Sequence, residues 1–146
     1  MNKIALIIIL TCSSAFAGDD KVIFDVSRFP DSGLMRMKTS NGYVLVVKRS
    51  HEAIAKLESQ KHPIYEEDPG VVKNIYRSIR KDLFVTYSPC RDGSQLSSFD
   101  LKKGFVCSDC AKYDLAGVPM NECAGKQPSV LPEHYYSDEK TLVLPK

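Results

Sequence analysis

Four cysteines in the second half of the chain are the residues whose type and spacing could do chemistry: Cys90, Cys107, Cys110 and Cys123. Their even number predicts two disulfides if the protein folds in an oxidising compartment. Cys107 and Cys110 also have the spacing of a metal-binding pair, so the sulfurs could instead hold zinc or an iron–sulfur cluster. A redox-active bond between Cys107 and Cys110 is the third interpretation. Count and compartment favour the disulfides, and the spacing alone leaves all three open.

The first 17 residues have the features of a secretory signal peptide. Lys3 precedes an unbroken apolar run over residues 4–10, and Ala15-Phe16-Ala17 has the Ala-x-Ala form of a cleavage site. The run is too short to span a bilayer, which takes roughly 20 residues. We therefore predict cleavage after Ala17 and a mature domain over residues 18–146.

The expected location is the periplasm, in soluble form, with no membrane-spanning segment after cleavage. An uncleaved anchor and a lipid on Cys12 are the alternatives. No twin arginine precedes the apolar run, so we expect export of an unfolded chain by the general secretory route. That route disfavours a cofactor inserted in the cytoplasm, and we expect none to be bound.

The charge balance points to no polyanionic partner. The chain has 20 Lys and Arg residues against 18 Asp and Glu residues. Such a small net charge gives no argument for nucleic acid or an anionic membrane. We expect the basic residues to be solvated, and the acidic triplet Glu66-Glu67-Asp68 to lie in a solvated loop rather than to bind a cation.

Short strands with turn signals between them predict an all-β domain. Asn41-Gly42 lies between two such strands and predicts a hairpin. Ser50 can cap one short helix that runs to about Glu58. Residues 59–72 are expected to form a surface loop, and residues 88–126, which hold the four cysteines, a small loop-rich subdomain. The expected strands lie at 21–26, 35–38, 43–47, 83–87, 135–136 and 141–144.

Several motifs occur in an order and spacing that resemble one known family. They are Phe24-Asp25-Val26-Ser27, Val46-Val47-Lys48-Arg49-Ser50, Tyr76-Arg77-Ser78-Ile79, Gly104-Phe105-Val106-Cys107, Tyr113-Asp114-Leu115-Ala116-Gly117 and the closing hairpin. Together they resemble the soluble domain of the Rieske iron–sulfur subunit of ubiquinol–cytochrome c reductase, over nearly the whole mature sequence. The resemblance implies a Rieske-like antiparallel β-sandwich base with an inserted subdomain at about 88–126.

The two cluster-binding boxes depart from the family pattern. The family has C-x-H-x-G-C and C-x-C-H-G, in which the first cysteine and the histidine of each box bind the cluster. With one-residue shifts, Cys90 and Cys107 match the ligand cysteines, whereas Asp92 and Cys110 replace the histidines. An alignment without gaps keeps no ligand. Both boxes are therefore degenerate in this chain.

This alignment also gives expectations for two further groups of residues. Gln95 and Asp109 fall on the pair that forms the family's disulfide, so that bond is lost. His51, His62 and His134 lie outside both boxes, and we expect surface or hydrogen-bonded roles for them.

The resemblance also implies that the loops carrying the four thiols converge at one tip. We therefore predict that Cys90 pairs with Cys107 or Cys110, and that Cys123 takes the other. A local Cys107–Cys110 bond with Cys90–Cys123 is the alternative.

Three functions follow. We do not expect an enzyme, and if the protein is one, we expect an electron-transfer (oxidoreductase) subunit. The first is a cluster-less binding or accessory module that contacts a periplasmic or membrane-complex protein. The second is electron transfer through an atypical [2Fe–2S] or other metal site formed by Cys90, Cys107, Cys110 and either Asp92 or Cys123. A thiol oxidoreductase that uses Cys107 and Cys110 is a third candidate.

Overall fold

The computed structural model describes residues 21–30, 33–91 and 94–145. The predicted signal peptide and Asp92 lie outside these residues. Within the described ranges the chain forms nine strands, one α-helix and three short 3₁₀ turns. In chain order they are β1 (Lys21–Asp25), η1 (Val26–Arg28), β2 (Leu34–Thr39), β3 (Gly42–Lys48), α1 (His51–Gln60), η2 (Gly70–Val72), β4 (Leu83–Tyr87), β5 (Leu96–Asp100), β6 (Gly104–Cys107), β7 (Lys112–Tyr113), η3 (Glu122–Ala124), β8 (Tyr135–Asp138) and β9 (Thr141–Pro145).

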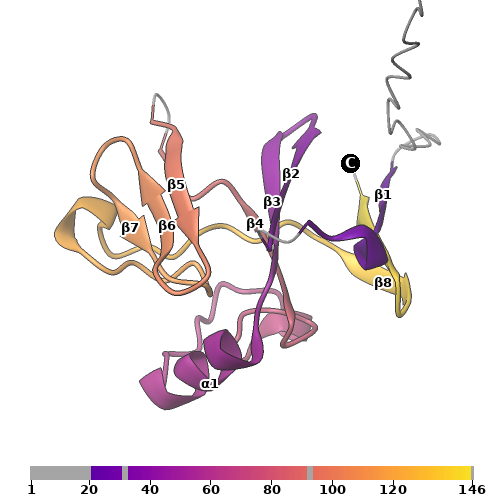
Figure 1. Cartoon of the computed structure of the whole chain (residues 1–146), viewed down its shortest axis with the longest axis horizontal. Coiled ribbons are helices and arrows are strands. Elements are labelled where there is room, and N and C mark those ends of the chain that lie inside the picture. Colours follow the sequence, from indigo (N-terminus) through magenta and orange to yellow (C-terminus); the bar gives the residue numbers. More distant parts are fainter. Residues whose placement is uncertain (1–20, 31–32, 92–93, 146) are drawn as a thin grey trace, which may run out of the picture.

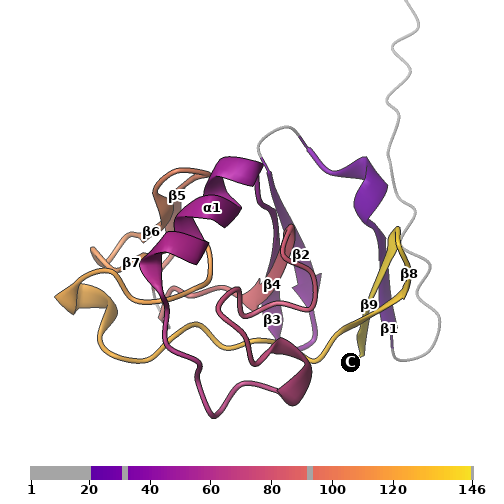
Figure 2. The same ribbon diagram turned by 90° about the horizontal axis from the view of Figure 1, so that it is seen from below.

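The strands form three antiparallel sheets of three strands each, in the orders β1-β9-β8, β2-β3-β4 and β5-β6-β7. Figure 1 shows the sheets in a row, with β2-β3-β4 in the middle and β5-β6-β7 at one end. In Figure 2, α1 lies at the same end of the molecule as the β5-β6-β7 sheet. The predicted all-β fold with one short helix is thereby confirmed.

The central sheet is buried on both of its faces. Leu45 and Val47 of β3 pack toward the β5-β6-β7 subdomain, in one core with Phe105. Val44 and Val46 pack in a second core with residues of the β1-β9-β8 sheet, such as Leu142. Because successive side chains of a strand point to opposite faces, an unbroken apolar run is what a strand between two cores requires.

The local signals at the two ends of β3 have clear structural causes. Ser40 and Asn41 form the turn between β2 and β3, and Gly42, which was expected in the turn, is the first residue of β3, where it pairs with Thr39 and has a φ of 117°. Ser50 caps α1, since its side chain accepts a hydrogen bond from the Ala53 amide at 3.2 Å. The helix continues two residues beyond the predicted end and stops where Lys61 adopts the left-handed conformation.

Three expectations about surface residues are wrong. The 59–72 segment is not entirely a surface loop, because it contains η2 and buries Val72. The acidic triplet is not entirely solvated either, because Asp68 is buried against Arg77. Arg77 and Arg49 are likewise buried, although we expected the basic residues to be solvated. Asp68 pairs with Arg77 nine residues away, whereas both arginines also donate to carbonyls that lie far away in the sequence.

Candidate functional site

The four cysteines come together at the subdomain as two disulfides. Cys90, which follows β4, is bonded to Cys107 at the end of β6, and their Cα atoms lie 5.5 Å apart. Cys110, in the turn after β6, is bonded to Cys123 in η3, with a Cα separation of 5.8 Å. This is one of the pairings that the resemblance implies, and it is not the alternative with a local Cys107–Cys110 bond.

The two disulfides differ in their surroundings. Cys107 is 2% exposed and belongs to the same core as Phe105, with Cys90 packed against that core. Cys110 is exposed and has a φ of 72°, in the left-handed region, within a turn closed by a 3.2 Å hydrogen bond from its amide to the Cys107 carbonyl. Access controls attack on a disulfide, so the Cys110–Cys123 bond is the more open of the two to thiols in solution.

Hydrogen bonds join the two loops near the positions where the family has its disulfide. The Ser108 amide donates to the Gln95 carbonyl at 2.8 Å, and the Gln95 amide donates to Ser108 Oγ at 3.0 Å. Gln95 and Asp109 are the residues that fall on the family's bonded pair. The contact between the loops is therefore kept, although no covalent bond joins these positions.

One further residue was predicted for the site, and the three histidines were expected to lie outside it. Asp92 is outside the described residues, so its role stays a prediction. His51 is exposed at the start of α1, and His62 Nε2 lies 2.7 Å from Asp114 Oδ2. His134 is buried beside Pro132. In the part of the chain that the structure describes, no three His, Cys, Asp or Glu side chains are grouped so that they could hold a metal ion.

Arg49 ties the subdomain to the base of the molecule, a role that its charge alone did not indicate. It is 3% exposed, and its Nε and Nη2 donate to the Leu115 carbonyl at 3.0 and 2.7 Å. Its other N–H groups donate to the Tyr76 carbonyl at 2.7 Å and to Ser78 Oγ at 3.0 Å. Burial lowers the pKa of Arg49 to about 9, with the nearby Asp114 charge opposing that shift. The guanidinium is thus still charged at neutral pH and is held mainly by carbonyl oxygens.

Arg77 makes the second buried link. Its Nε and Nη2 each donate to one carboxylate oxygen of Asp68, both at 2.7 Å. Its remaining hydrogen bonds reach the Ala116 carbonyl at 2.9 Å and the Ser129 carbonyl at 2.8 Å. Such a two-point pair is geometrically specific as well as strong. The two arginines together bind the adjacent carbonyls of Leu115 and Ala116.

The segment held by these arginines is folded tightly by its own sequence. Asp114 Oδ1 accepts from the amides of Ala116 and Val118 at 2.8 and 3.0 Å, which fixes the turn. Gly117 has a φ of 69° and lies so close to the Ser129 side chain that a Cβ there would overlap it. The sequence of this turn is therefore restricted by backbone conformation and by space.

The comparisons agree with this architecture. No protein-family model matches the chain. Among curated proteins, the chain is similar to the ubiquinol–cytochrome c reductase iron–sulfur subunit of Allochromatium vinosum, with 29% identity over 140 residues. The match covers 82% of this chain and 67% of that subunit.

Within the described residues, none of the helices has the length and apolar character needed to cross a membrane. The similarity extends over most of the chain, and the sheets and the inserted disulfide-bonded subdomain fit it. Together these findings support a Rieske-like domain.

Proposed function

We propose that this protein is an exported Rieske-fold module that has lost the [2Fe–2S] cluster and works by binding a partner protein in the periplasm. The observation that carries the proposal is the bond between Cys90 and Cys107. These are the cysteines that the resemblance places at the two ligand positions. A thiolate is the form that binds iron, and sulfurs bonded to each other supply none.

The residues at the histidine positions support the same conclusion. Cys110 replaces one imidazole and is itself bonded to Cys123. Asp92 replaces the other, and a carboxylate there would add negative charge where the family has a neutral ring. Two imidazoles on one iron are what raises the potential of a Rieske centre. The donor set at the tip therefore does not fit a Rieske cluster.

A binding role is favoured over thiol chemistry. All four sulfurs form disulfides, and one of the bonds lies against the core. Two covalent links and the buried arginines give the subdomain a fixed shape, and a rigid surface loses little entropy on binding. The relative is a subunit of a larger reductase. By extension, this chain also assembles with another protein, and it docks on a periplasmic or membrane-complex partner.

The cluster part of the proposal is tested with the full chain, expressed with its leader and purified anaerobically from the periplasm. We expect no visible cluster absorption and no stoichiometric iron or acid-labile sulfide. Stoichiometric iron and sulfide would contradict this and would promote electron transfer through an atypical cluster. Intact mass tests export, with an expected start at Gly18. A chain that starts at a lipidated Cys12 would contradict that site.

The binding part has a separate test. A tagged copy in the native cell, cross-linked before lysis, is expected to be recovered in a discrete complex with an envelope protein. A Cys110→Ser/Cys123→Ser variant should lose that complex if the subdomain shape is what the partner contacts. A free monomer in every growth condition would contradict a binding role.

A further inference from the structure

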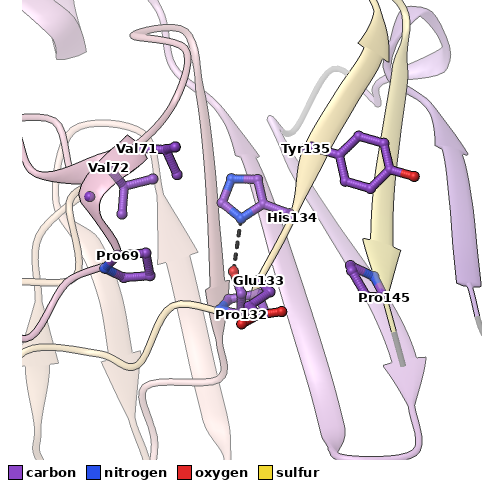
Figure 3. Close-up of a pocket in the computed structure, with 9 residues that line it drawn as sticks. Pro69, Val71, Val72, Pro132, Glu133, His134, Tyr135 and Pro145 are labelled. Atoms are coloured by element: carbon purple, nitrogen blue, oxygen red, sulfur yellow. Dashed lines mark hydrogen bonds between the residues drawn. The ribbon is translucent and has the colours of Figure 1, made fainter.

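Two surface pockets differ in the groups that they offer to a ligand. The larger has a volume of about 490 Å³ and lies between η2 and the segment that leads into β8. Figure 3 shows Pro69, Val71 and Pro132 around this space, whereas the Tyr135 side chain points away from it. Nε2 of His134 is buried, so a molecule in this pocket cannot reach it. A ligand there would find mainly apolar contacts, and the second pocket offers charges instead.

The second pocket has a volume of about 320 Å³ and lies beside the disulfide-bonded subdomain. One of its walls is the segment after β4, which includes Pro89 and Arg91. The opposite wall is the segment after η3, which includes Gly125 and Lys126. Sites for small molecules have volumes of roughly 300–1,000 Å³, so this pocket is large enough for a compact one.

Covalent and hydrogen bonds fix both walls. Each wall begins next to a disulfide, which involves Cys90 on the first wall and Cys123 on the second. Tyr113 also lines the pocket, and its side chain is almost fully buried. Its hydroxyl donates to the Ala124 carbonyl of the second wall at 3.3 Å. The shape of the pocket is therefore formed in advance, and a ligand loses little free energy in ordering it.

Arg91 and Lys126 give this pocket a positive charge. Both side chains are exposed, and neither forms an ion pair among the residues that the structure describes. The Arg91 guanidinium lies against Gly125, where a Cβ atom would be 2.9 Å from Nη2. It is also close to Tyr113, because burial raises the pKa of that phenol and the Arg91 charge opposes the shift.

The charges of the lining favour an anion. The described lining residues include these two cations and no Asp or Glu. Like charges that line one pocket repel each other, and a negative group between them would relieve that repulsion. The guanidinium of an arginine can also donate two parallel hydrogen bonds to the two oxygens of a carboxylate.

The apolar part of the lining selects the body of the ligand. Pro89, Pro128 and Val130 contribute carbon surface beside the two cations. An apolar cavity of about 150 Å³ holds one benzene ring. A pocket of about 320 Å³ therefore has room for one ring together with a carboxylate.

We propose that this pocket binds a small organic carboxylate whose body is one ring or an apolar chain of similar size. Arg91 donates to the carboxylate, Lys126 adds the second positive charge, and Pro128 and Val130 contact the body. The proposal goes beyond the function proposed above and does not rest on it, since neither the loss of the cluster nor a partner protein takes part.

Three probes test the chemistry without any change to the protein. Benzoate has both the ring and the charge, benzamide has the ring without the charge, and acetate has the charge without the ring. Each is titrated at constant ionic strength against the full mature protein with its disulfides formed, and binding is followed by amide chemical shifts.

We expect saturable binding of benzoate, with shifts in residues 87–91 and 124–130, and about tenfold weaker binding of benzamide. Acetate should bind more weakly than benzoate, since it lacks the apolar body. Equal affinity of benzoate and benzamide would overturn the role of the cations, and equal affinity of acetate would overturn the role of the apolar wall. No saturable binding of benzoate would overturn the site.

Charge-matched variants test the location. Arg91→Gln should weaken benzoate binding about tenfold, and Lys126→Gln should weaken it about threefold, because the ammonium lacks the two-point geometry of the guanidinium. Lys140→Gln is the control, since it removes the same charge from an exposed turn between β8 and β9, at the other end of the molecule (Figure 1). All three side chains are exposed, so the fold should tolerate each change. Benzoate binding that is the same in Arg91→Gln as in Lys140→Gln would overturn the proposed location.

Discussion

Two cores flank the central sheet, and alternate residues of the same strands build them. On one face, Leu45 and Phe84 pack with the subdomain, beside two buried arginines and two disulfides. On the other face, Val46, Leu142 and Leu144 form a core made largely of apolar side chains. The same sheet is therefore joined to its two neighbours by different kinds of interaction.

The two faces differ in what attaches the neighbouring unit to the central sheet. The β1-β9-β8 sheet contributes a row of aliphatic side chains, and burial of those side chains is enough to attach it. The subdomain contributes apolar side chains such as Phe105 and Leu115 to the first core, but its strands are short, and β7 has two residues. Small units of this kind are commonly held by covalent links. Here the buried arginines add directed bonds to the carbonyls of Leu115 and Ala116.

The largest expected effect is the loss of the buried ion pair. Asp68→Ala leaves the Arg77 guanidinium, which is 1% exposed, without its carboxylate. Breaking a buried pair from one side costs about 3–5 kcal/mol, and urea unfolding measures it. Glu66→Ala is the matched control, since Glu66 pairs with Lys73 at 2.8 Å but its side chain is 87% exposed. A similar loss of stability in both variants would contradict the special role of the buried pair.

The second effect tests the apolar face. Leu142 is fully buried and lies between β1 and β8. Leu142→Ala should destabilise the protein by about 2–5 kcal/mol, through lost burial and the cavity left behind. Ile23→Ala, in the same sheet at a half-exposed position, should cost clearly less. If the two changes were equally costly, the aliphatic core would not be what attaches this sheet.

The third effect concerns the outer disulfide. Cys110→Ser/Cys123→Ser removes a link between residues 13 positions apart. The chain-entropy model assigns about 3 kcal/mol to a loop of this length. A mild reductant should bring the wild-type protein to the same stability as the variant, because the exposed bond is reduced before the one in the core. Wild-type stability in the variant would show that this bond does not hold the subdomain.

The smallest effect is a pH dependence from His134. Its pKa is lowered in the folded protein by burial, whereas the unfolded chain has the ordinary value near 6.5. The unfolded state thus binds the proton first, so this stability is present above about pH 6.5 and is lost as the pH falls. His134→Gln should flatten the stability profile between pH 7 and pH 5, and His51→Gln, at an exposed position, should not. An unchanged slope in His134→Gln would contradict a neutral, buried ring.

The elements of the base could be predicted because their signals are local. Asn41-Gly42 requires a turn, the apolar run from Tyr43 to Val47 requires burial, and Ser50 supplies the cap. The alternation on β3 assigns residues to two faces but does not say what covers each face. Contacts between sheets decide that, and they join distant parts of the chain.

The buried charges could not be predicted in the same way. Arg49 and its carbonyl partner at Leu115 are 66 residues apart, and Asp68 lies in a run of acids that is otherwise exposed. A charged side chain is usually solvated, and only the fold brings these partners to it. The burial of His134 Nε2 without a hydrogen-bond partner could not be predicted for the same reason. Strand β5 was not predicted either, because the turn-forming residues of the surrounding segment indicate loops.

The central claim is that Cys90 and Cys107, which the resemblance places at the two ligand positions, are bonded to each other. Peptide mapping of the protein purified from its native cells, with free thiols blocked at lysis and no reduction, tests it most directly. We predict one linked peptide pair that contains Cys90 and Cys107, and a second that contains Cys110 and Cys123. Blocked, unpaired Cys90 and Cys107 in protein that also contains stoichiometric iron would contradict the account.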